Sequence, residues 1–225
     1  MRVLAIDTAL GACSAAVVDT AGGPSHVVSL EMTRGHAEAL MPEVKRVLDA
    51  AGGLAGVERV VVTVGPGSFT GLRVGLACAR AIGLGAGLPV VGVTTLSALA
   101  APVLDGGDGA TPVAAAIDAR HGRVFFQAFG GDGRSLVSPR LIEAREAARA
   151  LGEGPALVVG SGADLVIAAA DDPSIRKAEA RHEAPEPVWL ARLGAACDPA
   201  EQPPRPLYLK AADAHPQQGG RIARR

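Results

Sequence analysis

The feature of this sequence that most constrains its fold is a glycine-rich turn between an apolar strand and a helix. The run VVVTV (60–64) is typical of a buried strand, and GPGSFTGLRVG (65–75) leads from it into a helical pattern that we expect over about 70–85. Strands and helices that alternate through short turns are the pattern of α/β proteins. The glycines of the turn favour close backbone contacts rather than side-chain catalysis.

The turn matches none of the standard nucleotide-binding or nucleophile motifs. It lacks the Gly-Lys-Ser/Thr of a Walker A loop, Thr70 stands where the dinucleotide fingerprint needs its third glycine, and Pro66 replaces the first glycine of a nucleophile elbow. Two alternatives remain for its polar groups. Ser68 or Thr70 is the N-cap of the following helix, which we favour, or the amides around Gly67 and Ser68 hold a phosphate at the helix N-terminus.

The chain reads as two series of strands and helices, separated by the break DGGDG (105–109). In the first series we expect strands over 3–7, 12–19, 25–32, 59–64 and 89–93 and helices over about 37–51 and 70–85. In the second we expect strands over 112–118, 123–129 and 156–159 and helices over 143–151, 163–170 and 187–196. This organisation predicts an N-terminal lobe (1–104), a C-terminal lobe (105–210) and a flexible tail (211–225).

The two series begin alike, with AIDTALG (5–11) and AIDARHG (116–122) at a constant offset. Each reads as a buried strand, a glycine-aided turn and a returning strand, so we expect a duplicated α/β unit that begins with a hairpin in a mixed sheet. Asp7 and Asp118 end the two strands. They either face Mg²⁺ and phosphates between two lobes or cap their own turns, and we favour capping.

Two helices carry apolar faces that could serve inside the lobe or at a subunit interface. The helix after the turn aligns Gly71, Gly75 and Ala79 on one face, which allows another element to approach closely. The preceding helix is amphipathic, and Pro42 should kink it or mark its start. Burial against the lobe's own sheet and contact with a second protein chain explain these faces equally well.

Charge, cysteine and histidine usage make several classes of function improbable. Lys and Arg total 22 and Asp and Glu total 23, so no global field draws the protein onto nucleic acid or a membrane. Three scattered cysteines favour a reducing cytoplasm. No HxxxH or HExxH occurs, and Leu40 stands four residues after His36, so we expect no metal site. The uncharged stretch 81–104 is divided by glycines and a proline, which argues against a membrane span.

Five segments together resemble the TsaB (YeaZ) family: MRVLAIDTALGACSAAVVD (1–19), GHAEALMP (35–42), GPGSFTGLRVGLACARAIGLGAGLPVVGVTTLSALA (65–100), AAIDARHGRVFF (115–126) and PLYLK (206–210). The resemblance implies an α/β protein with the two-lobed actin-like (sugar kinase/Hsp70/actin) fold, in which mixed sheets are flanked by helices. It also implies a non-catalytic, cytoplasmic subunit. TsaD-type relatives carry an HxxxH metal motif, and His36 with Leu40 agrees with its loss.

The resemblance further implies partners. A TsaB-like subunit binds a TsaD-type catalytic subunit and, with a TsaE-type ATPase, supports transfer of threonylcarbamoyl to the adenosine next to the tRNA anticodon; alone it forms a homodimer, and tRNA is contacted through the complex. Interfaces in this family use the first two helices. The resemblance therefore implies an interface role for Leu40, Met41, Val44, Leu48, Gly71, Leu72, Gly75 and Ala79. No cofactor of its own is implied, and whether ATP or ADP sits at the joint near Asp7, Gly67 and Ser68 stays open. The alternative is a stand-alone ATP-dependent phosphotransferase.

Overall fold

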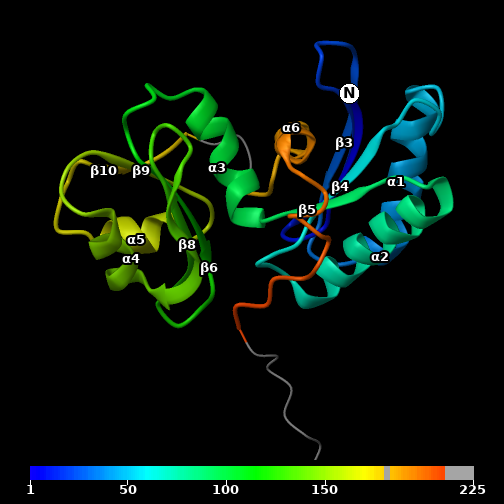
Figure 1. Ribbon diagram of the computed structural model, residues 1–225. Coiled ribbons are helices and arrows are strands. Elements are labelled where there is room, and N and C mark those ends of the chain that lie inside the picture. The colour runs from blue at the N-terminus through cyan, green and yellow to red at the C-terminus, as the bar shows by residue number, and fades with distance from the viewer. Residues whose placement is uncertain (180–182, 211–225) are drawn as a thin grey trace, which may run out of the picture.

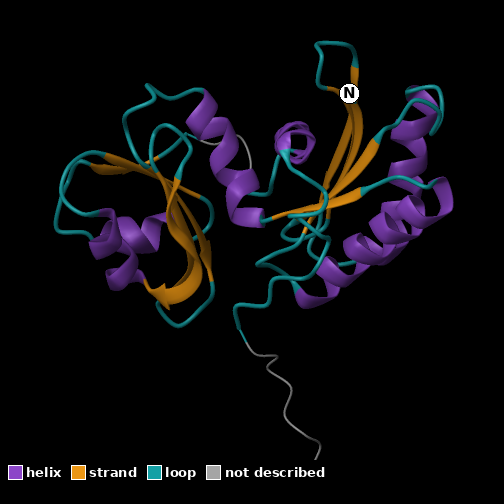
Figure 2. Ribbon diagram, in the orientation of Figure 1, coloured by secondary structure: helices purple, strands orange, loops and turns teal. Residues whose placement is uncertain are grey.

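The computed structural model describes residues 1–179 and 183–210, which form two lobes, each built around a five-stranded mixed sheet flanked by helices (Figures 1 and 2). The predicted tail (211–225) lies outside the described residues. Within those residues, no helix combines the length and hydropathy that crossing a bilayer requires.

The first lobe confirms the predicted strand–turn–helix unit and the elements around it. Its elements are β1 (Arg2–Asp7), β2 (Ala12–Asp19), β3 (Ser25–Glu31), α1 (His36–Ala50), β4 (Arg59–Thr63), α2 (Phe69–Ala86) and β5 (Val90–Val93). The sheet order is β3-β2-β1-β4-β5, in which β1, β2 and β3 pair antiparallel and β1, β4 and β5 run parallel. Helix α1 continues through Pro42, so that residue does not mark its start.

The inner strands β1, β2 and β4 of the first sheet are buried on both faces, and their side chains alternate between the two. Leu4 and Ile6 of β1 pack under α1 and α2, whereas Val3 and Ala5 contribute to a separate core cluster on the other face. A strand that is covered on both sides reads as a continuous apolar run, which is why β1 and β4 show little polar alternation in the sequence.

The second lobe repeats the topology of the first. It contains β6 (Val113–Asp118), β7 (Arg123–Phe129), β8 (Ser135–Glu143), α4 (Ala144–Leu151), β9 (Ala156–Val159), α5 (Ala163–Ala168) and β10 (Ile175–Lys177). Its sheet order, β10-β9-β6-β7-β8, is the first sheet's order with each strand replaced by its counterpart. This agreement supports the duplication inferred from the two Ala-Ile-Asp hairpins. The sequence patterns did not predict the edge strands β8 and β10.

Two helices cross between the lobes. Helix α3 (Thr95–Asp105) follows the first sheet but packs Leu96, Leu99 and Ala100 against the second one, in a cluster with β6 and β7. Helix α6 (Pro187–Ala196) follows the second sheet but packs Leu190 and Ala191 against the first. The C-terminal part of the predicted second lobe (105–210) therefore lies with the first lobe, a placement that chain order alone does not reveal (Figure 1).

The end of α6 is tied to the first sheet by Arg59 at the start of β4. Its Nη1 donates hydrogen bonds to the carbonyl oxygens of Gly194 at 2.6 Å, Ala195 at 3.1 Å and Cys197 at 2.7 Å. The last carbonyls of a helix have no partner within the helix, and a cation is favourable there. Arg59 thus satisfies the α6 C-terminus and holds this helix on the sheet.

Candidate functional site

The glycine turn connects β4 to α2 and contacts the segment that follows β1. Ser68 is the N-cap of α2: its Oγ accepts a hydrogen bond from the Gly71 N–H at 3.2 Å, which confirms the favoured interpretation. The Ser68 N–H in turn donates to the Ala9 carbonyl at 2.8 Å. A Cβ on Gly67 would collide with that same carbonyl, so only glycine allows the turn to lie so close to Ala9.

The small-residue face of α2 packs against the end of β1. The Thr8 Oγ donates to the Gly71 carbonyl at 2.7 Å, and a Cβ on Gly71 would collide with the Thr8 carbonyl. A Cβ on Gly75 would lie 2.5 Å from Thr8 Oγ1. The close approach that the sequence predicted is therefore present, and its partner is the lobe's own backbone.

The same packing involves most of the residues predicted at the partner interface. Six of the eight predicted residues are buried inside the first lobe: Leu40, Val44, Gly71, Leu72, Gly75 and Ala79. Of these six, Val44 also lines a surface groove, together with Met41 and Leu48. A stripe of small or apolar residues has the same pattern whether it faces its own sheet or a partner, and here the sheet takes it. Met41 and Leu48 are the two predicted residues that reach the surface.

Met41 and Leu48 line an apolar groove between α1 and α2. The groove has a volume of about 560 Å³, and Leu54, Ile82 and Gly85 lie along it. The Met41 side chain is 55% exposed and its Sδ is 3.5 Å from Cys78 Sγ. Lys45 and Asp49 at the edge pair with each other at 2.5 Å. An apolar hollow on the surface of a helix pair is typical of a protein interaction site.

Asp7 is the last residue of β1, and its buried side chain forms hydrogen bonds that hold the end of this strand. Its Oδ1 accepts hydrogen bonds from the Thr63 hydroxyl at 2.6 Å and the Ala9 N–H at 3.1 Å, and Oδ2 has no hydrogen-bond partner among the residues the structure describes. Burial raises the pKa of this carboxyl to about 6. The Asp7 side chain therefore holds the β1–β2 turn, and it is not among the residues that line the interlobe cleft.

Asp118 occupies the equivalent position in the second lobe but is exposed. Its Oδ1 accepts from the Arg120 N–H at 2.7 Å, two residues ahead, as Asp7 does with Ala9. Both aspartates therefore cap the turns after their strands, the alternative that the sequence favoured. Asp118, together with the predicted residues Gly67 and Ser68, lines a cleft between the lobes.

The interlobe cleft has a volume of about 700 Å³ and lies beyond the carboxyl ends of β1 and β6. Its walls come from the glycine turn, the β6–β7 turn and the segment 207–210. That segment is held at the end of β4, because the Leu207 N–H donates to the Val64 carbonyl at 2.7 Å. The sequence did not predict the aromatic contact that this segment makes: the Tyr208 and Phe69 rings lie side by side, with centroids 5.3 Å apart.

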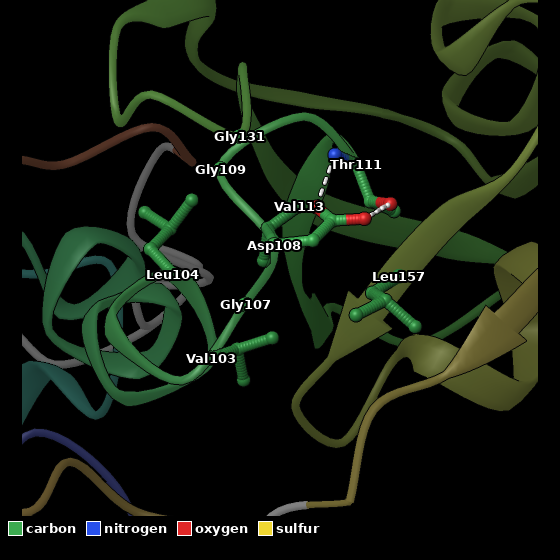
Figure 3. Close-up of a pocket in the computed structure, with 9 residues that line it drawn as sticks. All are labelled: Val103, Leu104, Gly107, Asp108, Gly109, Thr111, Val113, Gly131 and Leu157. Carbon is green, nitrogen blue, oxygen red and sulfur yellow. Dashed lines mark hydrogen bonds between the residues drawn. The ribbon is translucent and has the colours of Figure 1, made fainter.

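A smaller cavity lies beside the end of α3, at the edge of the second lobe. Figure 3 shows it between the end of α3, the loop 107–111 and Leu157 of β9. Asp108 points to its own loop, where Oδ1 accepts from the Ala110 N–H at 2.9 Å and the Thr111 N–H at 2.7 Å. These bonds lower the Asp108 pKa to about 2. Its carboxylate is thus used in closing the loop.

The described residues contain no group of three or more His, Cys, Asp or Glu side chains arranged to hold a metal ion. His36, the residue most worth testing as a ligand, instead places Nε2 3.2 Å from the Leu10 carbonyl at the same β1–β2 turn.

Two mixed sheets of the same strand order, each flanked by helices and meeting at one cleft, define an α/β protein of the two-lobed actin-like class. A hexokinase of the ROK type from Thermus thermophilus shares this fold, with a TM-score of 0.51 and 17% identity over 87% of this chain and 99% of that one. The structure of YeaZ from Pseudomonas aeruginosa is far more similar, with a TM-score of 0.77 and 27% identity over 92% of this chain and 99% of that one.

Sequence comparison reaches the same group. Residues 18–157 match the family model described as TsaD, tRNA N6-adenosine threonylcarbamoyltransferase. The tRNA threonylcarbamoyladenosine biosynthesis protein TsaB of Escherichia coli is 40% identical over 133 residues, which span 59% of this chain and 56% of that protein. The chain belongs to the TsaB (YeaZ) family, as its motifs indicated, and carries the domain of the TsaD family model.

Proposed function

We propose that this chain is a partner-binding subunit in tRNA threonylcarbamoyladenosine biosynthesis, and that the groove between α1 and α2 receives a TsaD-type catalytic subunit. The pathway is supported by family membership and by the names of its TsaB relatives. The observation that carries the partner role is the exposed apolar groove around Met41 and Leu48.

The groove suits a protein partner better than a small ligand. Its lining is almost wholly apolar, and the charged residues beside it, Lys45 and Asp49, already neutralise each other. A partner with an apolar helix surface would bury Met41, Leu48 and Ile82 at no cost in unpaired charge. When the partner is absent, the same surface would receive a second copy of the chain.

The remaining parts of the proposal concern what each subunit of the complex does. The TsaD-type subunit performs the transfer of threonylcarbamoyl to the adenosine beside the anticodon, a TsaE-type ATPase assists, and tRNA is contacted mainly through the complex in the cytoplasm. A non-catalytic role is consistent with Asp7 and Asp118, since each carboxylate is engaged by its own turn. ATP or ADP at the joint with the partner is part of the proposal, near Gly67 and Ser68.

The test is to block the groove without touching the core. Met41→Glu places a charge in it, and Gly85→Arg adds bulk at an open position, where no atom lies within 4 Å of an added Cβ. Each variant should weaken binding of a TsaD-type subunit at least about tenfold in calorimetry, because apolar anchors dominate such interfaces. Reconstituted tRNA modification, measured by nucleoside mass spectrometry, should fall in parallel.

Leu136→Glu provides the matched control, since Leu136 is 50% exposed on β8 of the other lobe. It should bind and modify like the parent. If both groove variants keep the parent affinity while melting at the parent temperature, the partner does not use this surface.

The alternative of a stand-alone phosphotransferase rests on the exposed carboxylate of Asp118 in the interlobe cleft. It requires steady ATP turnover by the isolated chain that Asp118→Asn abolishes. Turnover that survives this change, or no turnover at all, leaves the partner role as the better account.

A further inference from the structure

One flank of helix α2, together with the segment that lies beside it, carries positive charge and no negative charge. Helix α2 contains Arg73 and Arg80 but no Asp or Glu, and residues 204–210 contain Arg205 and Lys210 but again no Asp or Glu. The whole chain, by contrast, has 23 acidic and 22 basic side chains. The balanced composition therefore hides a local excess of cations.

Helix geometry and a pair of hydrogen bonds bring three of these cations onto one surface. Arg73 and Arg80 are seven residues apart, so they point within about 20° of each other and lie about 10 Å apart along the helix. The Arg80 Nε donates to the Pro204 carbonyl at 3.1 Å, and its Nη2 donates to the same oxygen. These bonds tie the segment that carries Arg205 to this side of α2 (Figure 1). We call Arg73, Arg80 and Arg205 the arginine flank.

The charges of the arginine flank are exposed and are not neutralised. All three side chains are exposed, and none of them pairs with a carboxylate among the residues that the structure describes. The groups that they contact are uncharged. The Arg73 guanidinium lies over the Phe69 ring, 3.8 Å from its centroid, and Arg80 binds a backbone carbonyl. Such contacts hold a guanidinium in place and leave its charge available to an anion.

The arginine flank and the groove between α1 and α2 lie on different sides of α2. Cys78, whose Sγ contacts Met41 of α1, points about 140–160° around the helix axis from Arg73 and Arg80. A protein in the groove would therefore leave the arginine flank uncovered.

We propose that the arginine flank binds the phosphate backbone of RNA. A guanidinium group presents two parallel N–H donors that match a phosphate. A strand of double-stranded nucleic acid carries one phosphate for roughly every 3 Å of its axis, so Arg73 and Arg80 would meet phosphates about three nucleotides apart. Ala77 is the exposed residue one turn beyond Arg73, so no apolar anchor of the kind that protein interfaces use stands between the two arginines. The choice of RNA over other polyanions rests on the proposed role in tRNA modification.

The test follows the anisotropy of a fluorescein-labelled RNA stem-loop as the chain alone is added at increasing salt. The logarithm of the binding constant falls with that of the salt concentration by about 0.7–0.9 per phosphate contact, so three contacts predict a roughly 100- to 500-fold loss of affinity between about 20 and about 200 mM salt. Arg73→Gln and Arg80→Gln should each reduce this slope by about 0.7–0.9 and weaken binding about five- to eightfold at about 0.1 M salt. Arg80→Lys keeps the charge and should keep the slope.

Arg140→Gln is the matched control. Arg140 is exposed on β8 of the other lobe and, like Arg80, donates to a backbone carbonyl, that of Ser138 at 3.2 Å. Its replacement removes the same charge from a distant surface, so the affinity and the salt slope should stay close to those of the parent.

The proposal is overturned if the parent does not bind the stem-loop at about 20 mM salt, where phosphate contacts are strongest, or if folded Arg73→Gln and Arg80→Gln keep the parent's slope. It is also overturned if poly-L-glutamate binds as tightly as the RNA and with the same dependence on Arg73, which would assign an acidic protein instead. Arg73→Gln should bind a TsaD-type subunit like the parent, and Met41→Glu should change RNA affinity little. Failure of RNA binding and failure of partner binding are therefore separate results.

Discussion

Replacing Gly75 by alanine places a Cβ 2.5 Å from Thr8 Oγ1, well inside the closest approach of real side chains. The hydroxyl has no free path away, because Thr8 is buried and donates to the Gly71 carbonyl at 2.7 Å. Overpacking of this kind costs about 1–3 kcal/mol. Alanine recovers about 0.5–1 kcal/mol through helix propensity, so we expect a net loss of about 1–2 kcal/mol.

Gly85→Ala is the matched control, since it makes the same substitution in the same helix where no atom lies within 4 Å of the new Cβ. It should gain up to about 1 kcal/mol, and the two variants should separate in melting temperature by several degrees in calorimetry. Adding Thr8→Ala to Gly75→Ala removes the obstructing hydroxyl, so a double-mutant cycle should show a favourable coupling of about 1–3 kcal/mol.

The reasoning is refuted if Gly75→Ala and Gly85→Ala change stability equally, or if the cycle shows no coupling. A folded Gly75→Ala protein that melts like the parent but no longer binds a TsaD-type subunit would restore the interface role that the sequence suggested for this face.

Two further predictions concern buried charge. The Asp7 pKa of about 6 lies above its ordinary value of 3.8, so the charged form of this carboxyl is disfavoured in the native state. The free energy of unfolding should therefore rise by roughly 1–1.5 kcal/mol, from this group alone, as the pH falls from about 7.5 to about 5. Asp7→Asn removes this contribution, and urea unfolding of both proteins at the two pH values checks it; an unchanged pH dependence in the variant contradicts the assignment. Arg59→Met leaves the α6 carbonyls without their donor and should cost about 1–3 kcal/mol in the same assay, with greater hydrogen exchange in α6 than in α2, whereas uniform exchange would deny Arg59 a local role.

The sequence predicted those parts of the molecule that depend on local pattern. Strand β4, the glycine turn and helix α2 follow from apolar runs, a capping serine and helical periodicity, and the duplicated hairpins follow from a repeat of only a few residues. Edge strand β8 escaped prediction because exposed strands need no apolar alternation, and β10 because it is three residues long.

The site was predicted less completely, because the direction in which a face points is a tertiary property. The spacing of Gly71 and Gly75 indicated a close neighbour, yet nothing local says that the neighbour is Thr8. The meeting of Phe69 with Tyr208 depends on a segment that returns from far along the chain. Only the assembled fold separates Asp7, which is buried, from Asp118, which is exposed at the equivalent position.

Because α3 and α6 each complete the other half's sheet, neither half of this chain carries all of its own core. Two copies of a half-length chain with this topology, each lending its last helix to the other, would give a two-fold symmetric dimer of nearly the same architecture. Joining the copies end to end would turn that exchange into the present connectivity. Expressed apart, the halves should be insoluble or poorly ordered, and expressed together they should find each other without a covalent link.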